Sequence, residues 1–398
     1  MKISLQFINI FYLSLVILWE PLQRVFLQVD GQGRIVAVFT VLVFILNIRH
    51  DNGFIPKYIF SKPMMFWTLW VIYSTINIMF QIYDGEMPFI YYFIHVIFKP
   101  YLVMLLACKE IIRDKKISLH ILAVVFTAYA LSSITILGGV VDYGGHVGRT
   151  IGELGNRGPL ITVFIIFFVG LLFVQGWLSL NKTIFFVVFS FAVIAMAATR
   201  KAFGGAVLIS LTLVLSQLEF RFKNILVVAL LSVVMYSGYN YAMENTLLGE
   251  RFEHGTEVGE KYNTTHIETL NFLGDRVNQY LLSWELFLDN KLSGVGLGNF
   301  MRETGSPLVL HSEYMVQLSE GGLLGTLLFL FFNLWIGTHI VKYWFCYPRR
   351  RPVIWLLAGA YGAVLFINLT AWTYSFPHYF IVFGTIIGYL KCIRYETK

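Results

Sequence analysis

The chain has 398 residues, of which 57% are hydrophobic and only 13% are charged. Soluble domains carry about 25% charged residues, so this composition argues against a water-soluble fold. The formal charge of +7 lies largely in short stretches between apolar runs, which favours membrane topology over binding of nucleic acid.

Apolar runs of the length that crosses a bilayer as a helix, about 20 residues, recur along the whole chain. The alternation typical of a membrane β-barrel is absent. We therefore expect an all-α, polytopic transmembrane helix bundle of about 12 spanning helices, with nine helices in residues 1–242, a large outer loop in 243–317 and three helices in 318–398. The expected spans are residues 3–19, 34–48, 64–83, 88–107, 117–138, 159–176, 183–199, 202–218, 224–242, 318–341, 353–371 and 376–391.

The distribution of positive charge selects one orientation for this bundle. With both termini in the cytoplasm, the inner loops collect most of the Lys and Arg residues, including Lys109 and the run 349–351. The first helix lacks a small-residue cleavage site and is expected to be retained. All three cysteines then fall at inner helix ends, which implies no disulfide framework.

Two polar features interrupt the first half of the bundle. Lys99 and Pro100 fall near the middle of the fourth expected helix, where an ammonium is costly unless it is paired or faces a water-filled cavity. The pair could serve function, or it could shape the bundle through a proline kink. Asp84 and Glu86 lie in an outer hairpin; an acidic pair could hold a metal, but ordinary topology explains it, and we expect no metal.

The one long outer connection, residues 243–317, is where function is expected. It contains a charged stretch at 250–253 and an amphipathic helix near 275–290, whose apolar face suits the membrane interface. Gly294, Gly296 and Gly298 follow this helix. They do not follow a strand, so they indicate a tight turn rather than a dinucleotide-binding loop, and their amides could also approach an anion.

Two blocks in this region, DNKLSGVGLGNF at 289–300 and HSEYMVQLSEGGLLG at 311–325, together resemble the O-antigen polymerase and O-antigen ligase family. Arg276 one helix upstream, the outer loop at 148–156 and the basic turn at 199–202 are similar to further features of that family. The chain departs from the family pattern at Lys291 and Tyr280, where proline and tryptophan are frequent.

This resemblance implies an integral-membrane glycosyltransferase of the GT-C type that uses a glycan on undecaprenyl diphosphate, without nucleotide sugar, cofactor or metal. Departure of a lipid diphosphate requires fixed positive charge, and the planar fork of arginine suits phosphate. We expect Arg200 and Arg276 to serve catalysis and Arg149, Arg157 and Lys201 to bind substrate. The alternative is that these side chains snorkel or pair with outer carboxylates.

His311 begins the second block and could accept the proton of the acceptor hydroxyl, or position a sugar or phosphate by a hydrogen bond. We expect it to be catalytic. Tyr280 and Glu320 are expected to contact substrate, although Glu320 could simply favour the start of the tenth helix.

The leading hypothesis is a polymerase of the cell inner membrane, with its site on the periplasmic side. It would transfer a growing glycan from undecaprenyl diphosphate to a lipid-linked repeat unit with inversion. A ligase that transfers the glycan to lipid A-core is the nearest alternative, and a flippase of lipid-linked sugars is the alternative from another class. Partners would be the glycan donor and acceptor, the lipid bilayer and a chain-length regulator.

Overall fold

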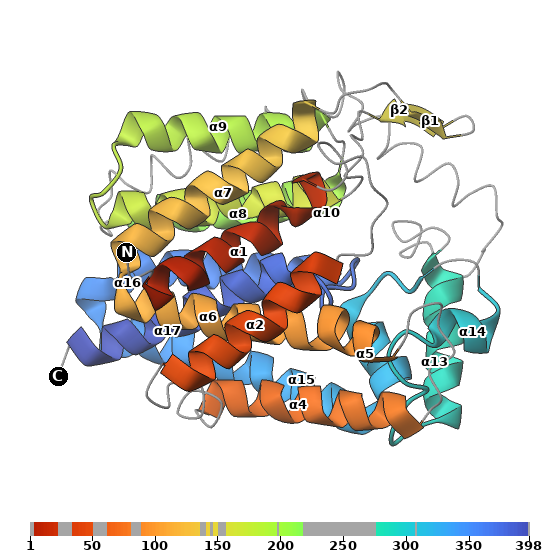
Figure 1. The fold of residues 1–398 in the computed structure, drawn as a ribbon. Helices are drawn as coiled ribbons and strands as arrows, with labels where there is room; N and C mark the ends of the chain where they lie inside the picture. Colours follow the sequence, from red (N-terminus) through yellow and green to blue (C-terminus); the bar gives the residue numbers. More distant parts are fainter. Residues whose placement is uncertain are drawn as a thin grey trace. The chain divides into compact units, whose positions relative to one another are not determined.

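A computed structural model describes residues 4–22, 34–50, 62–80, 89–135, 141–143, 146–149, 157–196, 199–217, 276–306 and 309–396. Helices dominate this part of the chain, in agreement with the predicted class (Figure 1). The chain divides into two compact units. Unit 1 comprises Met1–Val125, Asn278–Arg350 and Val364–Lys398, and unit 2 comprises Phe126–Val277 and Arg351–Ala363.

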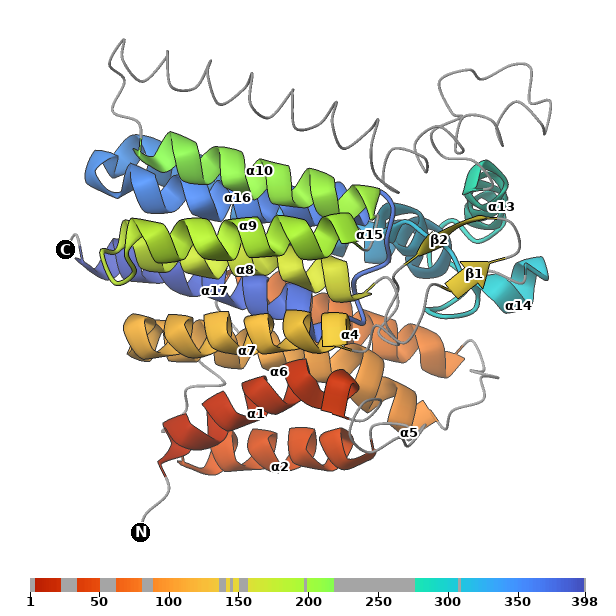
Figure 2. The same cartoon turned by 90° about the horizontal axis from the view of Figure 1, so that it is seen from above.

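Unit 1 contains most of the helices that the sequence predicts in the first and last thirds of the chain. Its helices are α1 (Leu5–Pro21), α2 (Arg34–His50), α4 (Lys62–Phe80), α5 (Phe89–Tyr92), the π-helix η2 (Phe93–Phe98), α6 (Lys99–Arg113), the first half of α7 (Lys115–Thr135), most of α13 (Arg276–Asp289), α14 (Phe300–Thr304), α15 (Glu313–Cys346), the 3₁₀ turn η4 (Pro348–Arg350) and α17 (Pro377–Glu396). Within this unit α4 lies alongside α15 (Figure 1), and α1 lies beside α2 (Figure 2).

Unit 2 packs α8 (Arg157–Val174), α9 (Leu180–Met196) and α10 (Arg200–Gln217) against one another, with the first part of α16 (Arg351–Asn368). A short antiparallel hairpin, β1 (Val141–Tyr143) and β2 (His146–Arg149), precedes α8 and was not predicted. The expected ninth helix at 224–242 and the loop from 243 to 275 lie outside the described residues.

Three helices of the described part are long and apolar enough to cross a membrane: Lys115–Ser132, Glu313–Cys346 and Pro348–Asn368. Five further apolar helices of 10–17 residues occur at Leu5–Pro21, Ile35–His50, Gly158–Val174, Leu180–Ala195 and Lys201–Gln217. Helix α15 exposes Leu323, Leu327 and Leu334 while it buries Gln317 and Asn333. An apolar exterior over a polar interior is the arrangement that a lipid environment favours, and it supports membrane association.

The fourth predicted helix is not a single α-helix. Its middle is the π-helix η2, in which the Lys99 amide donates to the carbonyl of Ile94, five residues before it. Pro100 follows directly; it has no amide hydrogen, and its ring would clash with the carbonyl four residues earlier in a regular α-helix. The π-turn thus lies directly before the position at which proline disrupts the regular α-helical hydrogen bonds.

The same helix extends beyond its predicted end, and this corrects the assignment of Lys109 to an inner loop. Lys109 lies inside α6 and is only 4% exposed. Its ammonium donates to Asn47 Oδ1 at 2.8 Å. Hydropathy alone assigns a lysine to a loop because it does not register a polar partner on another helix.

Glycines allow the close packing of α6 against α17 in unit 1. A Cβ on Gly384 would overlap the carbonyl of Met104, and one on Gly388 would lie 3.0 Å from the carbonyl of Cys108. These glycines are four residues apart and so share one face of α17. Small residues at this spacing let two helix backbones approach closely, as in membrane helix pairs.

Candidate active site at the broken helix

The tenth predicted helix begins earlier than expected, at Glu313 instead of 318, and is broken inside by Gly322, whose backbone angles are φ 61° and ψ −165°. The break leaves helix carbonyls before it and amides after it without helical partners. The glycine-rich turn, residues 291–299, supplies those partners. Four backbone hydrogen bonds of 2.8–3.2 Å join the segments: Val295 N–H to Ser319 C=O, Gly296 N–H to Glu320 C=O, Leu323 N–H to Lys291 C=O, and Leu324 N–H to Leu292 C=O.

Two glycines make this crossing sterically possible. Gly294 has φ +65°, and a Cβ there would lie 2.5 Å from the carbonyl of Glu320 and from the amide nitrogen of Gly322. A Cβ on Gly322 would in turn overlap the amide of Gly294. Since real Cβ contacts are not this short, both positions require glycine. The two sequence blocks that carry the family resemblance therefore meet in a single backbone structure.

Helix α4 holds the crossing with three polar side chains on one face. Trp70 Nε1 donates to Gln317 Oε1 at 2.7 Å. Tyr73 Oη lies 2.7 Å from the carbonyl of Gly321, and Asn77 Nδ2 donates to the carbonyl of Ser293 at 2.7 Å. Sequence reasoning missed these residues. Their spacing of three and four residues on an apolar helix was the available signal.

Two buried glutamates fasten loops to the first half of α15. The Glu320 carboxylate is 4% exposed and accepts the amides of Gly298 at 2.9 Å and Phe300 at 3.2 Å. These contacts give Glu320 a role in positioning the glycine-rich turn, and its predicted contact with substrate stays a prediction. Glu313, which sequence reasoning did not single out, accepts the amides of Thr373 at 2.5 Å and Tyr374 at 3.0 Å.

Tyr280 and His311 lie at the entrance to α15. The Tyr280 hydroxyl is 3.1 Å from the carbonyl of Leu369 and 3.4 Å from that of His311. One turn further along α13, Ser283 Oγ donates to the carbonyl of Met315 at 3.1 Å. The predicted amphipathic helix is thus confirmed as α13, and it anchors the segment that carries the half-buried His311.

A tyrosine approaches the glycine-rich turn, and a second tyrosine contacts the first. A Cβ on Gly298 would lie 2.8 Å from Tyr92 Oη, so the turn passes directly over this hydroxyl. Tyr92 Oη is 3.3 Å from Tyr374 Oη. Burial raises the pKa of Tyr374 well above its usual value, so the phenol stays protonated and can donate a hydrogen bond.

All of Tyr280, His311 and Glu320 belong to unit 1. The structure brings Tyr280 to the backbone of His311, whereas the Glu320 carboxylate contacts the glycine-rich turn. The predicted cationic residues belong to unit 2: Arg149 in β2, Arg157 at the start of α8, Arg200 and Lys201 at the start of α10, and Arg276 as the first residue of α13. From Asn278 onward α13 belongs to unit 1. The roles of these five residues stay predictions.

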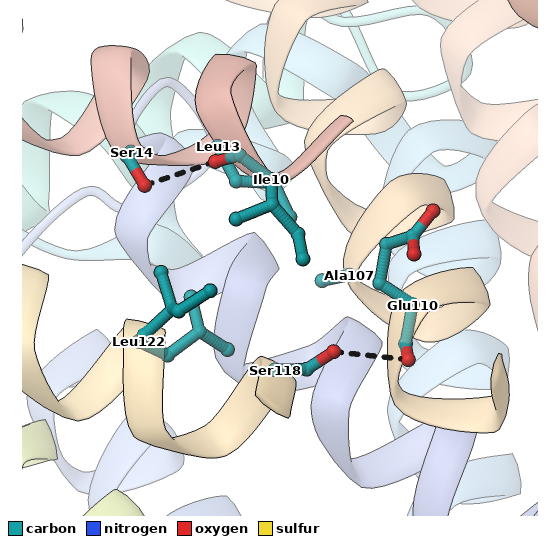
Figure 3. A pocket seen from close by; sticks show the side chains of 8 residues that line it. Ile10, Leu13, Ser14, Ala107, Glu110, Ser118 and Leu122 are labelled. Carbon is teal, nitrogen blue, oxygen red and sulfur yellow. Dashed lines mark hydrogen bonds between the residues drawn. The ribbon is translucent and has the colours of Figure 1, made fainter. Parts of the chain in front are cut away.

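A second buried polar cluster of unit 1 ties α1, α2 and α6 together. Asn9 Nδ2 donates to Glu110 Oε1 at 2.7 Å, and Asn47 Nδ2 donates to Asn9 Oδ1 at 2.7 Å. Lys109 joins through Asn47, and all four side chains are at most 4% exposed. Glu110 also lines a small, mainly apolar pocket between α1, α6 and α7, where its carbonyl accepts from Ser118 Oγ at 3.0 Å (Figure 3).

Within the described ranges, no three His, Cys, Asp or Glu side chains gather as metal ligands. Asp84 and Glu86 lie outside these ranges. No protein-family model matches the chain, and no curated protein matches it.

Proposed function

We propose that this chain is a membrane glycosyltransferase that polymerises a lipid-linked glycan. The donor is a growing glycan on undecaprenyl diphosphate, and the acceptor is a lipid-linked repeat unit. The enzyme is a GT-C-like bundle of about 12 spanning helices in the bacterial inner membrane, with both termini in the cytoplasm and its site on the periplasmic side.

One observation carries this proposal: the crossing between the glycine-rich turn and the broken helix α15. The two sequence blocks with the family resemblance, 289–300 and 311–325, share four backbone hydrogen bonds there. If each block resembled the family by chance, nothing would require the two segments to contact each other. Irregular backbone at membrane depth is tolerated where it is buried in protein or lines a cavity, and in transporters broken helices occur at substrate sites.

The proposed reaction is a single displacement at the anomeric carbon of the donor. The acceptor hydroxyl oxygen forms a bond to this carbon as the bond to the diphosphate oxygen breaks, and the configuration inverts. His311 accepts the proton of the hydroxyl. Arg200 and Arg276 stabilise the charge that develops on the departing diphosphate, so that no metal is needed, with Arg149, Arg157 and Lys201 holding the substrate. Tyr280 and Glu320 complete the binding surface by fixing the segments around His311.

The test is a reaction of the purified protein with undecaprenyl diphosphate-linked repeat units, read as a glycan ladder on a gel. Wild-type protein should form a ladder. His311→Ala should abolish it because general-base catalysis alone contributes roughly 10²–10⁴-fold. Arg276→Ala should abolish it because the departing diphosphate loses a stabilising charge. His50→Ala and Arg113→Ala are the matched controls, since both residues are exposed at the ends of other helices. They should retain the ladder.

Other outcomes of the same assay would replace this proposal. If no ladder forms but glycan is transferred to added lipid A-core, the protein is a ligase with the same donor. If neither transfer occurs with validated substrates, the glycosyltransferase assignment is wrong and lipid-linked sugar transport becomes the function to test.

A further inference from the structure

Three positively charged side chains surround one histidine near the C-terminal end of α15. The charges of Lys62, Lys342 and Arg394 all act on the imidazole of His339. They come from three helices: Lys62 begins α4, Lys342 lies near the end of α15, and Arg394 lies in the last turn of α17. All three are exposed, and His339 is half-buried. Positive charge is therefore concentrated at this end of unit 1.

Ring contacts in the middle of the three helices explain why these residues meet. Two pairs of phenylalanine rings set the level of the helices, with centroid distances of 5.7 Å for Phe66 and Phe331 and 5.2 Å for Phe332 and Phe383. Helix α4 begins at the same end of unit 1 at which α17 ends (Figure 1). At about 1.5 Å per residue, Lys62 lies about 6 Å beyond its ring pair, Lys342 about 15 Å and Arg394 about 17 Å. Long, flexible side chains span the remaining differences in level.

Trp335 fixes the imidazole that the three cations surround. The rings of Trp335 and His339 stack with centroids 3.7 Å apart and an interplanar angle of 20°. His339 Nδ1 lies 2.8 Å from the carbonyl of Trp335. A carbonyl only accepts, so Nδ1 carries a proton and donates it in this hydrogen bond. The group at the centre of the cluster is thus held by its own helix.

Carboxylates neutralise other cations at this end of the unit. Glu396 pairs with Lys115 and, at 2.7 Å, with Arg350. Among the ion pairs of the described residues, none includes Lys62 or Lys342. Like charges that lie together repel one another, so an anion bound between them would stabilise the arrangement.

The surface beside Lys342 is apolar, which distinguishes a phospholipid from a free anion. Val341 and Phe345 are 58% and 67% exposed. From Leu323 to Cys346 helix α15 is about 36 Å long, more than the hydrocarbon core of about 30 Å. In a bilayer the last turns of α15 therefore reach the headgroups, while its exposed apolar side chains face acyl chains. Basic pockets between membrane helices are known sites for anionic headgroups.

We propose that Lys62, Lys342 and Arg394 bind the headgroup of an anionic phospholipid between the ends of α4, α15 and α17, with its acyl chains along α15. The inference does not depend on the proposed function. It differs from the general preference of lysine and arginine for one side of a membrane, because a site requires these particular lysines together.

The experiment measures lipid binding to the purified full-length chain in detergent by native mass spectrometry. Phosphatidylglycerol is the anionic probe, and phosphatidylcholine has a phosphate but no net charge. Wild-type protein should bind phosphatidylglycerol more tightly than phosphatidylcholine. The double variant Lys62→Ala with Lys342→Ala should bind phosphatidylglycerol about thirtyfold more weakly, since a lysine at the headgroup contributes about fivefold. Arginine at both positions should retain most of the affinity, because it keeps both charges.

The matched control removes the same charge from another surface. Arg113 and Lys116 are exposed near the junction of α6 and α7, and neither charge acts on His339. Arg113→Ala with Lys116→Ala should therefore leave binding of phosphatidylglycerol nearly unchanged. Thermal unfolding provides a second measurement: phosphatidylglycerol should raise the midpoint of wild type and of this control, but not of the Lys62→Ala with Lys342→Ala variant.

Four results would overturn the inference. Equal affinity of wild type for the two lipids would show that net charge is not recognised. Unchanged binding of phosphatidylglycerol by the Lys62→Ala with Lys342→Ala variant would show that these lysines do not form the site. An equal loss in the control would show that binding follows total charge. Displacement of phosphatidylglycerol by an equal concentration of inorganic phosphate would show that the site takes a free anion.

Discussion

The substitution Gly294→Ala tests the crossing on which the candidate site depends. A residue with a Cβ in the left-handed region costs about 1–2 kcal/mol. The new methyl group would lie 2.5 Å from the carbonyl of Glu320, so the turn must move away from α15. That movement breaks the adjacent bonds from the amides of Val295 and Gly296, worth about 1 kcal/mol each. The expected loss of folding stability is therefore about 3–4 kcal/mol.

Gly305→Ala is the matched control for this substitution. Gly305 has the same φ of +65°, but a Cβ there meets nothing within 4 Å. It should cost only the backbone term of about 1–2 kcal/mol. Unfolding is followed by tryptophan fluorescence in one detergent, by heating at one scan rate and by denaturant titration. Equal destabilisation by the two substitutions would refute the close approach of the turn to the broken helix.

Two further predictions concern buried polar groups of unit 1. Asn47→Leu should destabilise the protein by about 3–5 kcal/mol, because it leaves the buried Lys109 ammonium without one of its acceptors. Thr40→Val on the same helix removes a hydrogen bond between neutral groups and should cost about 1 kcal/mol. Denaturant titration of both variants gives the comparison, and equal costs would contradict a charged cluster. Glu320→Gln should lower the thermal midpoint of unfolding, because an amide nitrogen then faces a backbone amide of the glycine-rich turn. Glu303→Gln, at an exposed ion pair, should leave the midpoint nearly unchanged. An unshifted midpoint for Glu320→Gln would show that the carboxylate does not hold the turn.

Sequence reasoning located most helices but misjudged their interruptions. Hydropathy predicted α9 and α10 closely, because a run of apolar residues bounded by polar ones depends only on local composition. It did not predict the π-turn before Pro100 or the early start of α15 at Glu313. Glu313 and Lys109 read as loop residues because each is charged, and their partners are distant in sequence.

At the candidate site, too, sequence reasoning identified individual residues but not the contacts between distant segments. The resemblance singled out His311, Tyr280 and Glu320, which lie in one region of unit 1 around α13 and the start of α15. It gave no sign of the contacts that α4 makes through Trp70 and Asn77. Those contacts join residues more than 200 positions apart in the chain, so the spacing along α4 could mark these residues but not identify their partners.

The sequence by itself determined the helical class and the apolar character of this protein, and it marked Gly294 and Gly322 as parts of two glycine-containing blocks. These properties follow from local composition, since each helix satisfies its own backbone hydrogen bonds. Only the tertiary structure decided that the two glycines face each other. A helix broken at Gly322 has unpaired backbone groups, and a second segment must reach them before the break becomes stable.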